Sequence, residues 1–398
     1  MTAMPADEAI PSSYRDGYRE ARARDAETAD TYIVHTTIGD PPADRVVEDL
    51  ARDFEPAQAA AILAAAIQNP GDLPEKAPHS LHELVEQVSV LPNWYDAEVA
   101  LAATKAFLRN SEMVLAGLVG AAIVEGFSTL ISKSFRIRGR IMGNGVRRLK
   151  QNLIQLVEQF LPGGMEPGGD GWRLTLRIRL VHAQSRMLLK DLAEWNSPTH
   201  GVPISAAHLL LASAAFSGRL MRHVQALGGD FSAEERDAYV HVWRYTGIVM
   251  GVPEQIMFHD MQSSLRAFDT AAQCEPAPDL DAIIMANSIV NSAPLLLGFT
   301  ETEERRAKAK YIYSVSRSLI GNDLADKLNY PPPKKIKDLP LLRLKNRLER
   351  ALQQIRPGWG SRLMRTKFTA MLDVSALDEF GPSFALPTSV HDEDSEEW

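Results

Sequence analysis

The chain has a single cysteine, Cys274, among its 398 residues. One thiol cannot form an intramolecular disulfide and cannot build an all-thiolate metal site. The longest apolar run, residues 113–124, ends at Glu125 after about twelve residues, whereas a membrane span needs about twenty. The first residues lack the basic segment and apolar run of a secretory signal. These absences predict a cytoplasmic protein without a membrane span.

Several sequence motifs and patterns are also absent. The chain contains no P-loop, no GxSxG elbow and no GxGxxG after a strand, and we find no alternating strand pattern or internal repeat. No glutamate stands three residues before a histidine, which disfavours a ferritin-like di-iron bundle. Because one cysteine is too few for an iron–sulfur cluster, imidazole-bound iron is the plausible metal centre. The net charge of −8 argues against a nucleic-acid binder.

The remaining pattern predicts an all-α protein in three parts. Residues 1–75 form an N-terminal helical extension with a partly disordered start, and residues 76–375 form one large helical domain. Residues 376–398 are an acidic tail that is too polar to pack. Within the extension we expect a polar surface helix over about 14–30, capped by Ser12 or Ser13.

Glu125 lies within a helical stretch, residues 113–130, that is apolar nearly all round and is therefore interior. A carboxylate in such a place must be paired, protonated or functional. A structural partner such as an arginine is the favoured interpretation. A role as catalytic acid or base is the alternative.

The segment 172–190 contains no proline or glycine and predicts a helix on which Arg179, His182 and Arg186 share one face. A neutral imidazole can bind a metal, and guanidiniums can pair with carboxylates. Haem, with one iron and two propionates, needs that combination. The alternative from spacing alone is a hydrogen-bonded core histidine between ordinary ion pairs.

The sequence of residues 179–186, RLVHAQSR, resembles the VRxxHAxxR signature of the MpaB-like oxygenases, the family that includes the latex-clearing rubber oxygenases. Further family-like segments keep the family's order: Leu91–Asp96, Trp195, Gly201–Ile204, Trp243–Gly247 and Gly251–Glu254. The resemblance spans roughly residues 80 to 260.

The resemblance implies an all-α fold with globin-like helix packing around a b-type haem. It implies that His182 is the axial ligand to iron and that Arg179 and Arg186 bind propionates or fix the helix. The distal side of the rubber oxygenases carries an Arg-x-x-x-Thr pattern with a lysine before the threonine. Arg148 matches the arginine, but Asn152 and Gln151 replace the threonine and the lysine. The departure implies a substrate other than polyisoprene, or altered or lost activity.

The implied activity is the use of dioxygen to cleave or oxidise a carbon–carbon double bond of an apolar, isoprenoid-like substrate. The catalytic candidates are Arg148, Asn152 and Glu125. One alternative is a non-catalytic helical protein that keeps the fold and binds haem, a lipid or a partner. A third hypothesis is a haem monooxygenase or peroxidase that acts on a single substrate atom.

Overall fold

The computed structural model describes residues 9–138, 145–333 and 338–355, with side chains described up to residue 348. No strand occurs in these ranges, which confirms the all-α prediction. The whole predicted acidic tail, residues 376–398, and residues 1–8 of the predicted disordered start lie outside the described residues.

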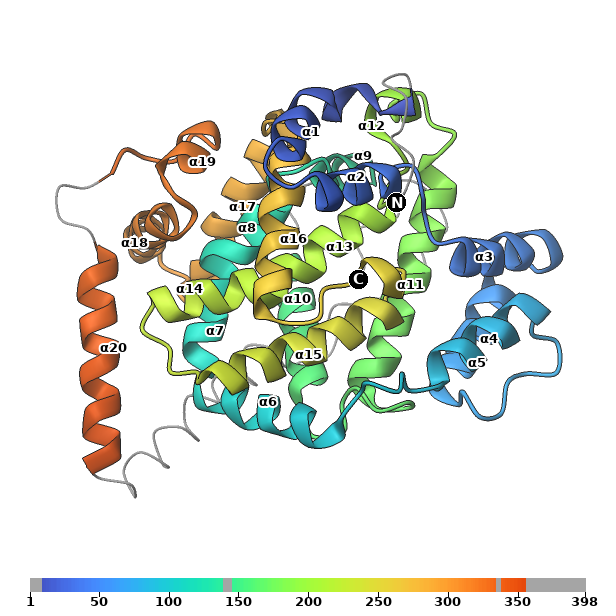
Figure 1. Ribbon diagram of the computed structural model, residues 1–398, viewed down its shortest axis with the longest axis horizontal. Coiled ribbons are helices and arrows are strands. Elements are labelled where there is room, and N and C mark those ends of the chain that lie inside the picture. The colour runs from blue at the N-terminus through green and yellow to red at the C-terminus, as the bar shows by residue number, and fades with distance from the viewer. Residues whose placement is uncertain (1–8, 139–144, 334–337, 356–398) are drawn as a thin grey trace.

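The helices follow one another with short connections (Figure 1). Those of the first half are η2 (Ser12–Tyr14), α1 (Arg15–Arg22), α2 (Ala26–His35), α3 (Pro41–Asp53), α4 (Pro56–Gln68), α5 (His79–Ser89), α6 (Ala97–Arg109), α7 (Ser111–Gly117), the π-helical turn η3 (Leu118–Ala122), α8 (Ile123–Phe127), α9 (Ile131–Arg138) and α10 (Gly145–Phe160). Those of the second half are α11 (Asp170–Leu189), α12 (Ser197–His200), α13 (Ala206–Ala214), the π-helical turn η4 (Ala215–Arg219), α14 (Leu220–Ala226), α15 (Ala233–Val249), η5 (Glu254–Ile256), α16 (Met261–Cys274), α17 (Leu280–Leu296), α18 (Thr302–Ile320), α19 (Asn322–Lys327) and α20 (Asp338–Ile355).

Local capping chemistry sets many of the helix starts. The Asp40 side chain accepts the backbone N–H of Ala43 at the start of α3, and Ser205 accepts that of His208 at the start of α13. Ser232 and Glu235 form a reciprocal capping box at the start of α15. Such side chains satisfy backbone N–H groups that have no partner within the helix.

The N-terminal surface helix predicted over 14–30 is wrong in two respects. The chain breaks at Asp25, whose side chain caps α2, so α1 and α2 are separate helices. Tyr14, Tyr18 and Ala21 are buried rather than solvated, because α1 packs against α16. The polar residues of α1 occupy only its outer face, which leaves an apolar face for the core.

One hydrophobic core joins residues from η2 to the loop after α19, so the N-terminal helices share it with the rest of the chain. The predicted boundary between residues 75 and 76 remains a prediction. In Figure 1, α13 crosses the centre, with α11 and α15 beside it and α20 along one flank. Within the described ranges, no single helix is long and apolar enough to cross a membrane. The bent pair Ala97–Arg109 and Ser111–Phe127, with an 83° angle, passes that test on length and composition only.

Candidate active site

A cavity lies between α8, α9, α10, α11, α13, η4 and α15, in the middle of the helical body. Its apolar wall consists of aromatic and aliphatic side chains: Ile123, Phe127, Ile131, Phe135, Ile178, Val181, Ile204, Leu209, Phe216, Trp243 and Met250. Polar side chains also line it, most of them on α10 and α11 or on the helices facing them: Ser134, Arg147, Arg148, Gln151, Asn152, Gln155, His182, Ser185, His208, Ser213 and Thr246. An apolar pocket with a few placed polar groups is the usual form of a small-molecule site.

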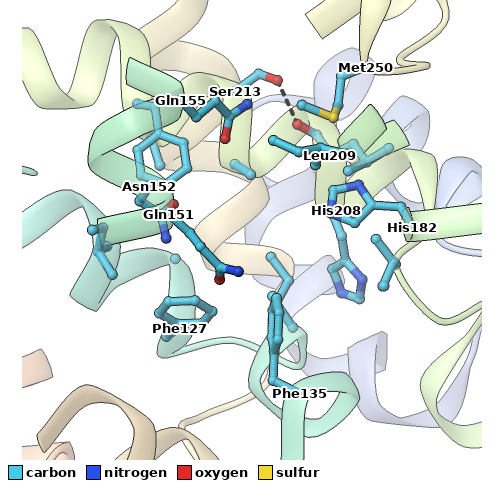
Figure 2. Close-up of a pocket in the computed structure, with 18 of the residues that line it drawn as sticks. Phe127, Phe135, Gln151, Asn152, Gln155, His182, His208, Leu209, Ser213 and Met250 are labelled. Atoms are coloured by element: carbon cyan, nitrogen blue, oxygen red, sulfur yellow. Dashed lines mark hydrogen bonds between the residues drawn. The ribbon is translucent and has the colours of Figure 1, made fainter. Parts of the chain in front are cut away.

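The polar side chains separate into two groups across this cavity. Figure 2 shows the imidazoles of His182 and His208 on one side and the amides of Gln151, Asn152 and Gln155 on the other. The imidazoles come from α11 and α13, and the amides all come from α10. A molecule in the cavity would therefore meet imidazole rings at one end and side-chain amides at the other.

His182 reaches the cavity because α11 presents Ile178, Val181 and Ser185 on the same side. The helix predicted over 172–190 is confirmed as Asp170–Leu189. Its two signature arginines, in contrast, contact α3 rather than the cavity. The structure therefore brings His182, Arg148 and Asn152 to one cavity and places Arg179 and Arg186 outside its lining.

Arg179 forms a two-point ion pair with Asp40. Its Nε and Nη2 lie 2.6 and 2.8 Å from the two carboxylate oxygens, and both side chains are almost fully buried. Its Nη1 donates to the carbonyl of Val249 at 3.4 Å. This arrangement ties α11 to the start of α3 and the end of α15. Of the two roles considered for Arg179, binding a propionate and fixing the helix, this arrangement supports the second.

Arg186 links α3 to the cavity wall. Its Nε lies 2.7 Å from Asp44 Oδ1, and its Nη1 donates to the carbonyl of Ile204 at 2.9 Å. Burial raises the pKa of Asp44, although the Arg186 charge opposes this shift. Ile204 lines the cavity with φ of +47°, which is strained for a β-branched residue. Arg186 therefore holds the strained turn that leads into α13 and His208.

On α10, Arg148 and Asn152 occupy successive turns at the cavity. The Arg148 guanidinium is buried and stands 4.3 Å from the centre of the Phe135 ring, a cation–π contact. The Asn152 Nδ2 donates to the backbone carbonyl of Arg148 at 2.8 Å. This bond uses one of the two amide N–H groups, so Asn152 keeps one N–H donor and its Oδ1 acceptor where a threonine would offer a hydroxyl.

Glu125 lies outside the cavity lining and is paired, as the favoured sequence interpretation predicted. Its carboxylate accepts from Arg219 Nη2 at 2.5 Å and lies 2.8 Å from His223 Nε2. Burial raises its pKa, but the charges of His223 and Arg219 outweigh burial and hold the pKa below its usual value. The ion pair joins α8 to the π-helical turn η4, and both contribute cavity residues. The catalytic role of Glu125 remains a prediction.

His208 is a cavity residue that sequence reasoning missed. Its Nε2 lies 3.0 Å from the Tyr14 hydroxyl and 3.4 Å from Glu275 Oε1. Glu275 Oε1 also accepts from the Tyr32 hydroxyl at 2.7 Å, and its Oε2 accepts from the Leu130 N–H at 3.0 Å. The only trace in the sequence is one imidazole in the apolar run 206–216. Its partners lie far away along the chain and could not be inferred.

Comparisons with known proteins agree with this architecture. A model of the family described as "ER-bound oxygenase mpaB/B'/Rubber oxygenase, catalytic domain" matches residues 105–344. The rubber oxygenase of Streptomyces sp. (strain K30) is 23% identical over 299 residues, which cover 73% of this chain and 70% of that protein. A solved structure of the latex clearing protein LCP in the closed state superimposes with a TM-score of 0.64 at 17% identity. That match covers 85% of this chain and 90% of the other.

The structural match shows a shared fold, and the family model covers more than half of the chain. The family predicted from the segment Arg179–Arg186 is therefore confirmed. The chain belongs to the mpaB/rubber oxygenase catalytic-domain family.

Proposed function

We propose that the protein is a haem b-dependent oxygenase that uses dioxygen to cleave or oxidise a carbon–carbon double bond of an apolar, isoprenoid-like substrate. Membership of an oxygenase family and the name of its Streptomyces relative support the reaction class. The observation that carries the proposal is the position of His182, the signature histidine, in the wall of a largely apolar cavity.

The residues of the cavity fit a haem. A porphyrin supplies four nitrogen ligands, so the protein needs to add only one imidazole, and His182 is suited to that role. No cluster of three or more potential ligand side chains for a bare metal ion occurs in the described parts of the chain. Of the two arginines at the cavity, Arg147 and Arg148, we assign Arg147 to a propionate. When bound, the haem would supply the binding and activation of dioxygen.

The protein's own residues would orient the substrate and exclude water. The side chains of Phe127, Phe135 and Phe216 give the cavity an apolar surface that suits an isoprenoid chain, and a bound chain would displace water from it. Arg148 places a positive charge beside Phe135 at this wall, where it can stabilise negative charge that develops during the reaction. Asn152 adds an amide, which can accept through Oδ1 and donate through its second N–H.

The visible spectrum of the purified protein tests the cofactor. We expect a Soret band with about one iron per chain, lost in His182→Ala. His241→Ala is the matched control because His241 lies outside the cavity lining, where it stacks on Tyr95. A colourless wild-type protein that does not take up added haemin would contradict the proposal.

Product analysis under oxygen then separates the remaining hypotheses. Cleavage of an isoprenoid alkene gives two carbonyl products, whereas a monooxygenase or peroxidase gives one oxygenated product with the carbon chain intact. A haem-loaded protein that forms neither product would favour the non-catalytic binding protein. The departures at Gln151 and Asn152 are the features consistent with that alternative.

A further inference from the structure

The His208 side chain is held by a buried network that spans the N-terminal and central helices. Tyr14 and Glu275 contact its Nε2, and Tyr32 and the Leu130 N–H hold the Glu275 carboxylate. Burial raises the pKa of Glu275, but His208 and the hydrogen bonds outweigh it and lower the pKa below the usual value. Glu275 Oε1 is an acceptor that faces His208 Nε2, so that nitrogen carries a proton.

The other ring nitrogen of His208 belongs to a set of buried polar atoms at the cavity. Among the described residues, His208 Nδ1, Ser134 Oγ and Thr246 Oγ1 have no hydrogen-bond partner. Each of the three residues is 1% exposed, and all three line the same cavity. Buried polar atoms are almost always hydrogen-bonded, and leaving one unpaired costs about 1–3 kcal/mol.

We propose that these three groups recognise a hydroxyl on the substrate, so that the preferred substrate is an unsaturated isoprenoid alcohol rather than a pure hydrocarbon. This inference rests on the proposed function of the same cavity. The three groups come from α9, α13 and α15, so three separate elements each contribute one unpartnered polar group to the cavity wall. A hydrocarbon has no hydrogen-bonding group, so its binding would leave these three polar groups without a partner.

A hydroxyl suits the site because it both donates and accepts. His208 Nε2 faces Glu275, so Nδ1 is the nitrogen left for the alcohol, which can donate to a neutral ring or accept from a charged one. The hydroxyls of Ser134 and Thr246 can rotate to complete the alcohol's remaining hydrogen bonds. An ether keeps only the acceptor, so it cannot donate to Nδ1 or to either hydroxyl.

The test is equilibrium binding to the purified full-length protein, measured by calorimetry, so it does not depend on turnover. The ligands are geraniol, its methyl ether and 2,6-dimethylocta-2,6-diene, the hydrocarbon that differs from geraniol only by loss of the hydroxyl. We expect geraniol to bind about ten-fold or more tightly than either of the others.

Two variants assign the preference to the polar groups. Thr246→Val has nearly the same shape and removes a hydroxyl that has no partner in the protein, so it should fold normally. His208→Leu removes the ring nitrogen, and its fold is checked by circular dichroism. Each should reduce the preference for geraniol about three-fold or more, mainly by weakening geraniol binding. Met250→Leu changes an apolar cavity residue and should leave the ratio unchanged.

The outcomes separate this inference from the proposed function. Equal affinity for geraniol and the hydrocarbon, with no effect of Thr246→Val, would overturn the hydroxyl inference and leave the oxygenase proposal intact. A preference for geraniol that survives both variants would also overturn it, since other residues would then recognise the hydroxyl. Failure of all three ligands to bind would contradict both proposals.

Discussion

Arg179 and Asp40, 139 residues apart, form a buried two-point ion pair with hydrogen bonds of 2.6 and 2.8 Å. Because Asp40 also caps α3, the pair connects the start of that helix to the middle of α11. The Arg179 side chain therefore connects three features: the cap of α3, the face of α11 beside His182 and the end of α15 at Val249.

Removal of Arg179 should be strongly destabilising. Arg179→Ala leaves Asp40 charged and buried, so we expect a loss of about 3–5 kcal/mol in the free energy of unfolding. The control is Arg306→Ala, which breaks a solvent-exposed pair with Glu303 and should cost less than about 1 kcal/mol. Chemical denaturation of both variants gives the two values. Equal, small losses would contradict a structural role for Arg179.

Gly251 should tolerate alanine much less well than another glycine with a similar backbone. Its φ is +101°, and an added Cβ would collide with Asp40 Oδ2 and crowd Arg179 Nε. Gly298, with φ of +82°, has nothing near an added Cβ. Gly298→Ala should therefore cost only the left-handed backbone penalty, about 1–2 kcal/mol. Gly251→Ala should cost at least twice as much in thermal or chemical denaturation. Equal costs would show that the ion pair moves aside easily.

Glu125 should contribute stability only while it is ionised. Its pKa is held below the usual 4.5 because His223 and Arg219 outweigh burial. A depressed folded-state pKa means that the contribution is complete above about pH 4.5 and is lost as pH falls through the lower folded value. The stability gap between wild type and Glu125→Gln should thus be largest near neutral pH and should narrow below pH 4.5. Glu303→Gln, an exposed site, should show almost no gap. A constant gap for Glu125→Gln would contradict this assignment.

Gln151→Lys should change how the haem-loaded protein binds external ligands. Gln151 lines the cavity on the side opposite His182, where the family resemblance places a lysine. If the protein holds the proposed haem through His182, a lysine at position 151 would compete with added imidazole for it, so we expect the affinity for imidazole to fall about ten-fold or more. Titration followed by the Soret shift measures this affinity. Gln155→Lys, one turn further along α10, is the control. Equal losses of imidazole affinity in the two variants would show that the effect is not specific to position 151.

Much of the secondary structure could be predicted from local patterns. The start of α4 at Pro56 and its end at Gln68, before Asn69–Gly71, follow from residues that favour helix starts and stops. The capping box of Ser232 and Glu235 and the helix that carries His182 were likewise predictable. The break at Asp25 was missed although its cap is a local signal, whereas the bend near Asn110 lies at a long-range contact, the hydrogen bond from Asn110 Nδ2 to the Asp230 carbonyl.

Sequence by itself determined the helical class, the family signature and the presence of a histidine on a core-facing helix. These depend on interactions within a few residues, which short patterns encode. Only the tertiary structure decided which partners the charged groups meet. Arg179 and Arg186 pair with α3, Glu125 pairs with Arg219 and His223, and His208 joins His182 at the cavity. Burial makes the ion pairs strong, but the partners in these ion pairs lie from 94 to 142 residues apart, where helical spacing carries no information.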